Sequence, residues 1–375
     1  MTDAVAAISG PAPAGRSLTR LALRRLLRNR AAVASAVFLV LVSALYVFGP
    51  YVYPHAYDEV YEAYVHTPPS LSPYPLSDTL QQVMATAAGE AHVNLGNFTL
   101  TGAGFRATFT ADKPIDPRVT RYVDRAVEFD DSHVTDTRDG GKTIVIEGSV
   151  RRVYFPMGTD GNGRDLFARI MIGGRISLTV GILATLVSLV IGVAYGAISG
   201  FAGGRTDNVM MRLIEILYSL PFVFLVIVLV VFFGRNFILI FVAIGAIEWL
   251  DMARIVRGQT LSLKRREFVA AAEAMGLSDW QTIRRHIIPN TVGPVIVFVT
   301  ILVPRVILLE SFLSFLGLGV QEPLTSLGAL IAEGASSIEA APWLLIFPSI
   351  FFVATLFALN FLGDGLRDAF DPRDR

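Results

Sequence analysis

Runs of hydrophobic residues without any charge alternate with polar segments along the 375 residues of this chain. A helix needs roughly 20 apolar residues to cross about 30 Å of hydrocarbon. Four charge-free runs have about that length: residues 31–49, 176–204, 216–234 and 340–363. The pattern therefore predicts at least four transmembrane helices.

Two further apolar runs contain charged residues. They cover residues 236–255 and 292–318, and each is long enough to span a membrane. We interpret both as transmembrane helices, which gives six in all and makes the fold class an all-α polytopic membrane protein. A charge at the middle of a bilayer costs at least about 2.5 kcal/mol, so the charged residues in these two runs need partners.

Arginine and lysine residues gather at one end of the predicted helices. They occur in residues 1–30, between the second and third helices, and in residues 254–285. Because positively charged loops remain in the cytoplasm, these segments and the tail 367–375 are expected there. The first helix, residues 31–53, has a longer apolar run than the core of a cleavable signal peptide, and we predict a retained anchor.

Three arginines depart from this charge rule. Arg164, Arg169 and Arg175 lie just before the second predicted helix, on the side that should face outward. We interpret residues 163–175 as an interfacial helix that lies along the membrane surface.

The segment between the first and second helices, residues 54–175, is polar and rich in turns, and is expected to be extracytoplasmic. Its pattern predicts a small inserted α+β domain over residues 76–150. The expected elements are a helix over 77–92, a strand pair over 97–110, a helix over 116–126, and a hairpin of residues 125–133 with 143–153. Such a domain either contacts another protein or is a passive insertion, since loops tolerate insertions.

Residues 264–290 form a polar segment rich in small side chains between two predicted spans. Its alanines favour a helix of little bulk, which Gly276 can end in a left-handed conformation. Ser278 and Gln281 have the spacing of a capping box, so a second helix is expected to start there and to end at Pro289. The prediction is a rigid helical hairpin on which a soluble partner can push.

Composition agrees with a membrane protein, because 53% of the residues are hydrophobic, 17% are charged and the mean hydropathy is +0.54. The formal net charge of zero gives no sign of a nucleic-acid partner. There is no cysteine, and the five histidines lack the spacing of metal ligands. The sequence contains neither a phosphate-binding loop nor a recognisable nucleophile and base. We therefore predict no enzyme, no cofactor and no metal site.

Several longer motifs carry a family resemblance. They are Gly158-Thr159-Asp160 with Gly163-Arg164-Asp165, then residues 253–264, the hairpin, residues 310–319 and residues 363–372. With these motifs in this order, the chain resembles the inner-membrane permease subunits of bacterial peptide-importing ABC transporters, most closely the C subunits of oligopeptide permeases. The resemblance covers residues 1–75 and 151–375.

The chain departs from the family pattern in two places. The hairpin of the family usually begins Glu-Ala-Ala, but Ala270 stands at the glutamate position. Residues 76–150 have no counterpart in the compact members. The first departure changes the surface offered to an ATPase, and the second leaves the role of the outer face open.

The resemblance implies six helices of the type I importer kind, five of them in a permease core over residues 176–366. It also implies a place in the bacterial inner membrane. The implied partners are a second permease subunit, two ATP-binding subunits, an extracytoplasmic peptide-binding protein and a peptide substrate. Coupling to the ATPase is assigned to nine hairpin residues: Glu267, Ala270, Ala271, Ala272, Gly276, Asp279, Arg284, Arg285 and Pro289.

Polar residues inside the spans are candidates for the translocation pathway, namely Arg305, Glu310 and Asn360. Glu310 either holds the amino group of a peptide or stabilises helix packing, and Asn360 is expected to hydrogen-bond between helices. Arg305 and Glu310 lie on different faces, so each should find its partner on another span or on the neighbouring subunit. An ionic ladder on one helical face is expected for three residues at three-residue steps: Glu248, Asp251 and Arg254.

The expected mechanism is alternating access, in which ATPases pull on residues 267–290 and rock the spans. The sequence does not identify the transported substrate, because the same architecture fits oligopeptides, dipeptides, nickel chelates or peptide antibiotics. The alternative from another class is a membrane receptor or scaffold that binds ATPases without moving solute.

Overall fold

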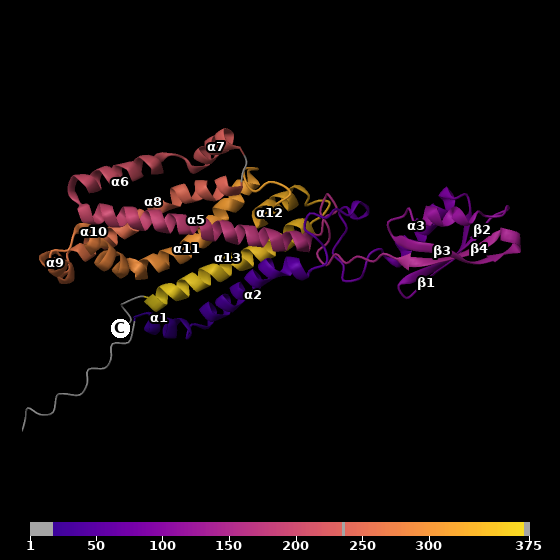
Figure 1. The fold of residues 1–375 in the computed structure, drawn as a ribbon, viewed down its shortest axis with the longest axis horizontal. Helices are drawn as coiled ribbons and strands as arrows, with labels where there is room; N and C mark the ends of the chain where they lie inside the picture. The colour runs from indigo at the N-terminus through magenta and orange to yellow at the C-terminus, as the bar shows by residue number, and fades with distance from the viewer. Residues whose placement is uncertain (1–17, 235–236, 371–375) are drawn as a thin grey trace, which may run out of the picture. The chain divides into compact units, whose positions relative to one another are not determined.

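The computed structural model describes residues 18–234 and 237–370 and divides into two compact units. One unit is Tyr57–Phe167 and carries a β-sheet. The other unit contains the helices that precede and follow it in the sequence. Figure 1 labels the elements of both units.

The helical unit contains α1 (Leu18–Leu26), α2 (Arg30–Val52), α5 (Leu166–Ala202), α6 (Gly204–Ser219), α7 (Phe222–Phe233), α8 (Phe237–Lys264), α9 (Glu267–Ala274), α10 (Asp279–Thr282), a π-helical turn (Ile283–Ile287), α11 (Ile288–Phe315), α12 (Leu327–Ser336) and α13 (Trp343–Phe370). Among the residues that the structure describes, four stretches are long and apolar enough to cross a membrane: α2, α5, Asp279–Phe315 and α13. The count is five if α6 and α7 together form one span. The remaining predicted span lies within α8.

Helix α13 packs against α2, α11 and α12. The ring of Tyr46 in α2 is fully buried against Gly174 of α5, where a β-carbon would collide with it. Large apolar side chains such as Val40 in α2 and Ile350 in α13 point outward and are more than half exposed. An apolar exterior of this kind is the surface that a membrane protein presents to lipid.

The prediction of one continuous third helix over residues 216–234 is wrong. Helix α6 ends at Ser219 and α7 begins at Phe222, with a bend of 81° between the two. Pro221 lies at the break, where its ring and missing N–H prevent a helix from continuing. Hydropathy alone does not register such a break, because Leu220 and Pro221 keep the run apolar.

The prediction of a separate interfacial helix over residues 163–175 is also wrong, because α5 runs without interruption from Leu166 for 37 residues. Two of the three unexpected arginines are buried against carboxylates instead of lying on a membrane surface. Arg164 Nε donates to Asp160 Oδ2 at 2.7 Å, and Arg169 Nη1 donates to Glu333 Oε2 at 2.9 Å. The positive charges of these two arginines are therefore compensated locally, which explains two of the three departures from the charge rule.

The sheet unit contains a 3-10 turn (Glu62–Tyr64), α3 (Ser77–Glu90), β1 (Asn94–Thr101), β2 (Gly104–Thr110), a second 3-10 turn (Pro117–Val119), α4 (Thr120–Val123), β3 (Phe129–Arg138), a third 3-10 turn (Asp139–Gly141) and β4 (Thr143–Val150). All pairings are antiparallel in the order β1-β2-β4-β3. Arg106 lies opposite Glu147 across the β2–β4 pair, and bulges interrupt both edge strands. The helix expected over 116–126 is reduced to a 3-10 turn and the single turn of α4.

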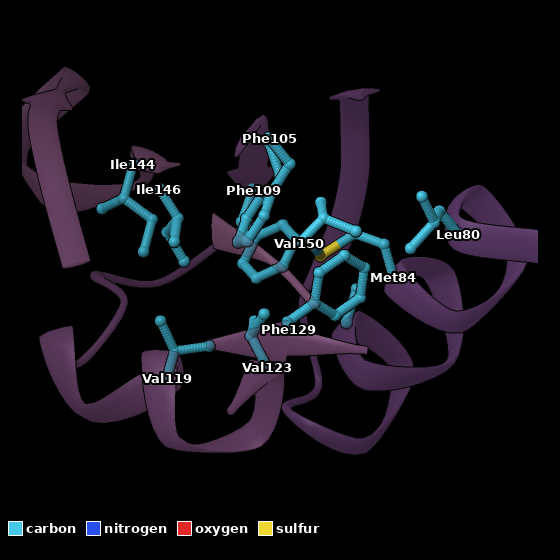
Figure 2. Packing of buried hydrophobic residues seen from close by; sticks show 12 residues of the cluster. Leu80, Met84, Phe105, Phe109, Val119, Val123, Phe129, Ile144, Ile146 and Val150 are labelled. Atoms are coloured by element: carbon cyan, nitrogen blue, oxygen red, sulfur yellow. The ribbon is translucent and has the colours of Figure 1, made fainter. Parts of the chain in front are cut away.

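A hydrophobic core packs α3 and α4 against the sheet, as Figure 2 shows. Leu80 and Met84 from α3 meet Phe105, Phe109 and Phe129 from the sheet, and all are 2% exposed or less. Burial of each such side chain contributes roughly 1.5–3 kcal/mol. The cluster contains residues of this unit alone, so the domain has its own source of stability.

The chain enters and leaves the sheet domain side by side. Tyr74 and Val153 exchange backbone hydrogen bonds of 2.8 and 3.0 Å. Next to these hydrogen bonds, the rings of Tyr64 and Tyr74 pack on the buried ring of Phe155. Burial raises the pKa of the Tyr64 hydroxyl to about 12, so it stays neutral at physiological pH.

Candidate functional site

The first limb of the hairpin follows directly from α8, as the orange segment of Figure 1 shows. Helix α9 begins at Glu267, and its alanines favour the helix. It ends in a Schellman motif, in which Leu277 N–H donates to Ala272 O and Gly276 N–H donates to Glu273 O. Gly276 has φ +82°, a left-handed conformation that other residues rarely adopt. The predicted ending of this helix is confirmed.

The second limb begins with the predicted capping box. Ser278 Oγ accepts from the Gln281 N–H, and the Gln281 side chain accepts from the Ser278 N–H. Both donors at the helix start are thereby satisfied, a contribution of about 1 kcal/mol. The capping box fixes the angle at which the chain turns back from α9.

The prediction that the second limb ends at Pro289 is wrong. The helix continues from Asp279 to Phe315, because the segment Ile283–Ile287 forms a π-helical turn. Ile288 N–H donates to Ile283 O, five residues back. The wider turn accommodates Pro289, whose ring would otherwise meet the carbonyl of Arg285. The second limb is therefore mechanically continuous with α11.

The inner side of the hairpin is fixed to the helices behind it. Val269 and Ile287 are fully buried, and they share one cluster with Phe201 of α5 and Val256 of α8. Lys264 Nζ donates to the carbonyl of Phe201 and lies 4.9 Å from the centre of its ring. Both limbs thus rest on α5 and α8 as one packed body.

The outer side of the hairpin is exposed and carries most of the residues predicted to couple. Of that set Glu267, Ala270, Ala271, Gly276, Asp279, Arg284, Arg285 and Pro289 are exposed. Ala272 is the exception, because it is fully buried in the packed side. Its burial places Ala272 among the residues that pack the hairpin, since helix periodicity turns this alanine inward while its neighbour Ala271 faces out.

Sequence reasoning missed three large apolar residues on the same outer side. Phe268 is 40% exposed, Met275 is 73% exposed and Trp280 is 58% exposed. Aromatic residues and methionine are enriched where proteins bind one another. Their hydrophobicity was the available signal, since none of the three fits the polar character of the hairpin.

A glycine repeat in α5, also missed, brings α5 close to α8. Gly192, Gly196 and Gly200 follow one another at four-residue steps on one face. A β-carbon at Gly192 would lie 2.5 Å from Met252 Cβ, and one at Gly196 would collide with the carbonyl of Ala253. Small residues at this spacing permit close contact between membrane helices. The repeat is visible in the sequence and could have predicted this contact.

Glu310 in α11 is completely buried among hydroxyl groups. Its Oε1 accepts from Ser314 Oγ at 2.8 Å and its Oε2 accepts from Ser177 Oγ of α5 at 3.2 Å. Ser177 Oγ in turn accepts from Leu327 N–H at the start of α12. Glu310 therefore connects α5, α11 and α12, which agrees with the packing role rather than with contact to a substrate.

Arg305, also in α11, is 48% exposed and lies opposite two acids of α8. Its Nη1 donates to Asp251 Oδ2 at 2.9 Å, and its Nε lies 3.6 Å from Glu248 Oε2. The expected ladder with Arg254 is wrong, because Arg254 lies over the ring of Tyr218 at 4.6 Å. The spacing of residues along α8 did not indicate that Asp251 pairs with Arg305 of α11 and not with Arg254.

Asn360 in α13 does not bridge helices as predicted. Its Nδ2 donates to Leu356 O of the same helix at 3.0 Å, and the side chain is exposed. The amide is satisfied locally because the carbonyl one turn back lies within its reach.

Two family models match the chain. Residues 192–375 match the binding-protein-dependent transport system inner membrane component. Residues 17–81 match the N-terminal TM domain of oligopeptide transport permease C. Most of the sheet domain, residues 76–150, falls between these two matches.

Curated relatives are similar over somewhat more than half of the chain. The oligopeptide transport system permease protein OppC of Haemophilus influenzae is 61% identical over 222 residues, which are 59% of this chain and 71% of the relative. OppC of Salmonella typhimurium is 63% identical over 222 residues, 59% of this chain and 73% of the relative. The dipeptide transport system permease protein DppC of Bacillus subtilis is 48% identical over 219 residues, 58% of this chain and 68% of the relative.

A solved structure of the methionine ABC transporter MetNI in an inward-facing conformation is also similar. It has a TM-score of 0.46 and 16% sequence identity, and the match covers 54% of this chain and 96% of that chain.

The apolar helices, the family-model matches and the curated relatives define a class of protein, the inner-membrane permease components of binding-protein-dependent transport systems. Within that class the chain belongs to the family of oligopeptide permease C proteins. The family is one of transport permeases and not of enzymes.

Proposed function

We propose that the chain is one of two permease subunits of an ATP-driven oligopeptide importer. Residues 267–290 would contact an ATPase subunit and transmit its conformational change to the spans. The outer side of the hairpin carries this proposal. It exposes Phe268, Met275 and Trp280 on a segment whose inner side is tightly packed. A partner that covers these side chains gains hydrophobic contact area and a firm point of contact.

Movement of the hairpin would reach the spans without a flexible joint. Its first limb follows α8, and its second limb continues into α11 through the π-helical turn. A displacement of the hairpin therefore tilts α8 and α11, and with them α5, which packs on α8 through its glycine repeat. Such rigid-body movement fits alternating access, in which the pathway opens first outward and then inward.

The partners follow from this arrangement and from the family. A second permease subunit would complete the pathway, and two ATP-binding subunits would grip the hairpins. An extracytoplasmic binding protein would deliver the peptide. Ala270, which replaces the usual glutamate, lies on the exposed side of α9. The ATPase would then meet an apolar surface at this point, which suits the exposed aromatic residues nearby.

Six spans and two cytoplasmic ends remain our proposal for the topology. The six are α2, α5, the bent pair α6–α7, α8, α11 and α13. Placing Lys264, Arg284 and Arg285 of the hairpin in the cytoplasm satisfies the preference of positive residues for that side. The location is then the inner membrane of a bacterial cell.

The sheet domain would be an extracytoplasmic insertion over residues 76–150. It has its own core and lies largely between the two family matches. We favour a passive role in transport, since the hydrogen bonds between Tyr74 and Val153 close the chain below it. Contact with the binding protein is the alternative.

The test uses the complete importer in vesicles, with labelled peptide and the cognate binding protein. Ala271→Arg should reduce ATP-dependent uptake to background, because the new side chain occupies the contact surface without disturbing the packed side. Ser262→Arg is the matched control, since Ser262 is exposed on α8 and lies outside the contact surface. Gly276 is a poorer test site, because any substitution there also strains the backbone.

Normal uptake by Ala271→Arg would contradict coupling through this surface. Partner binding without any ATP-dependent uptake by the unaltered importer would instead favour a scaffold. Uptake of dipeptides or metal chelates in place of oligopeptides would reassign the cargo and leave the architecture unchanged.

A further inference from the structure

Charged side chains are exposed at the middle of the helical unit, on one face. Arg305 lies near the middle of the 28-residue helix α11, and Asp251 lies near the middle of the 28-residue helix α8. Arg305 interrupts a stripe of exposed apolar residues that includes Ile301 and Leu308. A guanidinium within a membrane span is too costly to face lipid, so this face borders water or a neighbouring subunit.

The charges on this face are layered. Glu248 is 4% exposed and Asp251 is 23% exposed, whereas the side chain of Arg305 is 48% exposed. The carboxylates therefore lie beneath and the guanidinium lies outside. Glu248 Oε2 has no hydrogen-bond partner among the described residues, because Arg305 Nε at 3.6 Å is too distant. Arg305 is anchored to α8 mainly by Asp251. The side of its guanidinium that faces away from Asp251 is therefore available to bind a ligand.

A second exposed guanidinium lies three residues after Asp251 along α8. Arg254 of α8 is exposed and stacks on the half-exposed ring of Tyr218 in α6, and it forms no ion pair with any described residue. Arg254 also borders a groove of about 700 Å³ between α6 and α8. That volume is in the range of sites that hold small ligands.

We propose that the exposed guanidiniums of Arg305 and Arg254 bind the terminal carboxylate of the peptide as it passes through the permease. This proposal rests on the proposed function and names the part of the substrate that the pathway recognises. Arginine presents parallel N–H donors that match the two oxygens of a carboxylate. Every unmodified peptide has one such group, so the site serves peptides of any sequence.

The acids beneath the guanidiniums favour weak, reversible binding of the peptide over tight binding. Asp251 competes with the peptide for the donors of Arg305, because its own contact is already short at 2.9 Å. Binding to a shared donor is weaker than binding to an isolated one, which favours release on the other side of the membrane.

The test compares two forms of one labelled peptide in vesicles that contain the complete importer. One form has a free terminal carboxylate and the other has a terminal amide. The measured quantity is the ratio of the two ATP-dependent uptake rates, so that differences in delivery by the binding protein cancel between variants. Arg305→Gln should lower the acid-to-amide ratio about tenfold, the loss expected for a charge-assisted hydrogen bond. Arg254→Gln should lower it in the same direction.

Asp251→Asn is the decisive comparison, because it breaks the same ion pair as Arg305→Gln but leaves the guanidinium in place. A purely structural ion pair predicts that both variants slow both peptides alike, and that result overturns the proposal. The carboxylate site predicts a lowered ratio for Arg305→Gln but not for Asp251→Asn. If Arg305→Gln does not assemble, Arg254→Gln decides by the same ratio. Arg205→Gln, at an exposed arginine in the first turn of α6, should leave the ratio unchanged.

The unaltered importer separates this proposal from the function on which it rests. If it takes up neither peptide with ATP, the proposed function fails and the carboxylate site falls with it. If it takes up both peptides and the ratio is the same in every variant, only the carboxylate site is wrong.

Discussion

At the scale of single residues, two charged groups five positions apart on α11 have opposite surroundings. Glu310 is buried and accepts hydrogen bonds from serines of α5 and α11, and Arg305 is half exposed across from two acids. The sequence indicated that both needed partners but not which partners. Burial and tertiary contact decide that question, and neither is encoded in the spacing along one helix.

Replacing Glu310 tests its packing role. Glu310→Ala removes the acceptors of two buried hydroxyls and leaves a cavity, so we expect a loss of ~3 kcal/mol in stability. Glu310→Gln keeps the shape and one acceptor and should cost less. The measurement is the thermal unfolding midpoint of the purified protein in detergent. A midpoint for the alanine variant equal to that of the unaltered protein would argue against a packing role.

The capping box offers a second test at this scale. Ser278→Ala removes the acceptor for the Gln281 N–H and should destabilise the second limb by about 1 kcal/mol. Hydrogen exchange of residues 279–283 should then become about fivefold faster. Ser262→Ala is the control, because Ser262 is exposed on α8. Unchanged exchange in the Ser278 variant would show that the cap contributes nothing to the rigidity of the hairpin.

At the scale of helices, side-chain volume controls how closely α5 and α8 approach. The capping residues and the left-handed glycine of the hairpin could be predicted because their chemistry is local. The break at Pro221 and the π-helical turn before Pro289 could not be located in the same way. In both places a proline is visible in the sequence, but the surrounding packing determines whether the helix bends, widens or ends.

The helix contact can be tested with one matched pair of substitutions. Gly196→Ala places a methyl group against the backbone of α8, and we expect overpacking to cost about 1–3 kcal/mol. Gly258→Ala introduces the same methyl group in α8 at a position with no neighbour within 4 Å. That control should be neutral or slightly stabilising, because alanine favours a helix. Equal unfolding midpoints in detergent for both variants would contradict close packing at Gly196.

At the scale of the whole molecule, two units with separate cores share one chain. The strands were predictable from their alternation of apolar and polar residues, and the apolar spans from the length of their hydrophobic runs. The number of spans was harder, since α8 carries charges and the third apolar run is bent. Contacts between helices, including the ion pair of Arg305, depend on positions distant in sequence and so required the structure.

Removing the sheet domain tests its proposed passive role. Replacing residues 76–151 with two glycines should leave the unfolding midpoint of the helical unit unchanged, because the deleted residues contain the whole core of the domain. ATP-dependent peptide uptake should also be retained. A correctly folded variant that no longer responds to the binding protein would assign the domain a role in docking instead.

The paired backbone bonds between Tyr74 and Val153 have a practical consequence. A chain that leaves and returns at one point allows the material beyond that point to be exchanged as a cassette. Evolution can lengthen or shorten it without re-optimising the bilayer helices. An experimenter can use the same junction to attach an epitope or a fluorescent reporter.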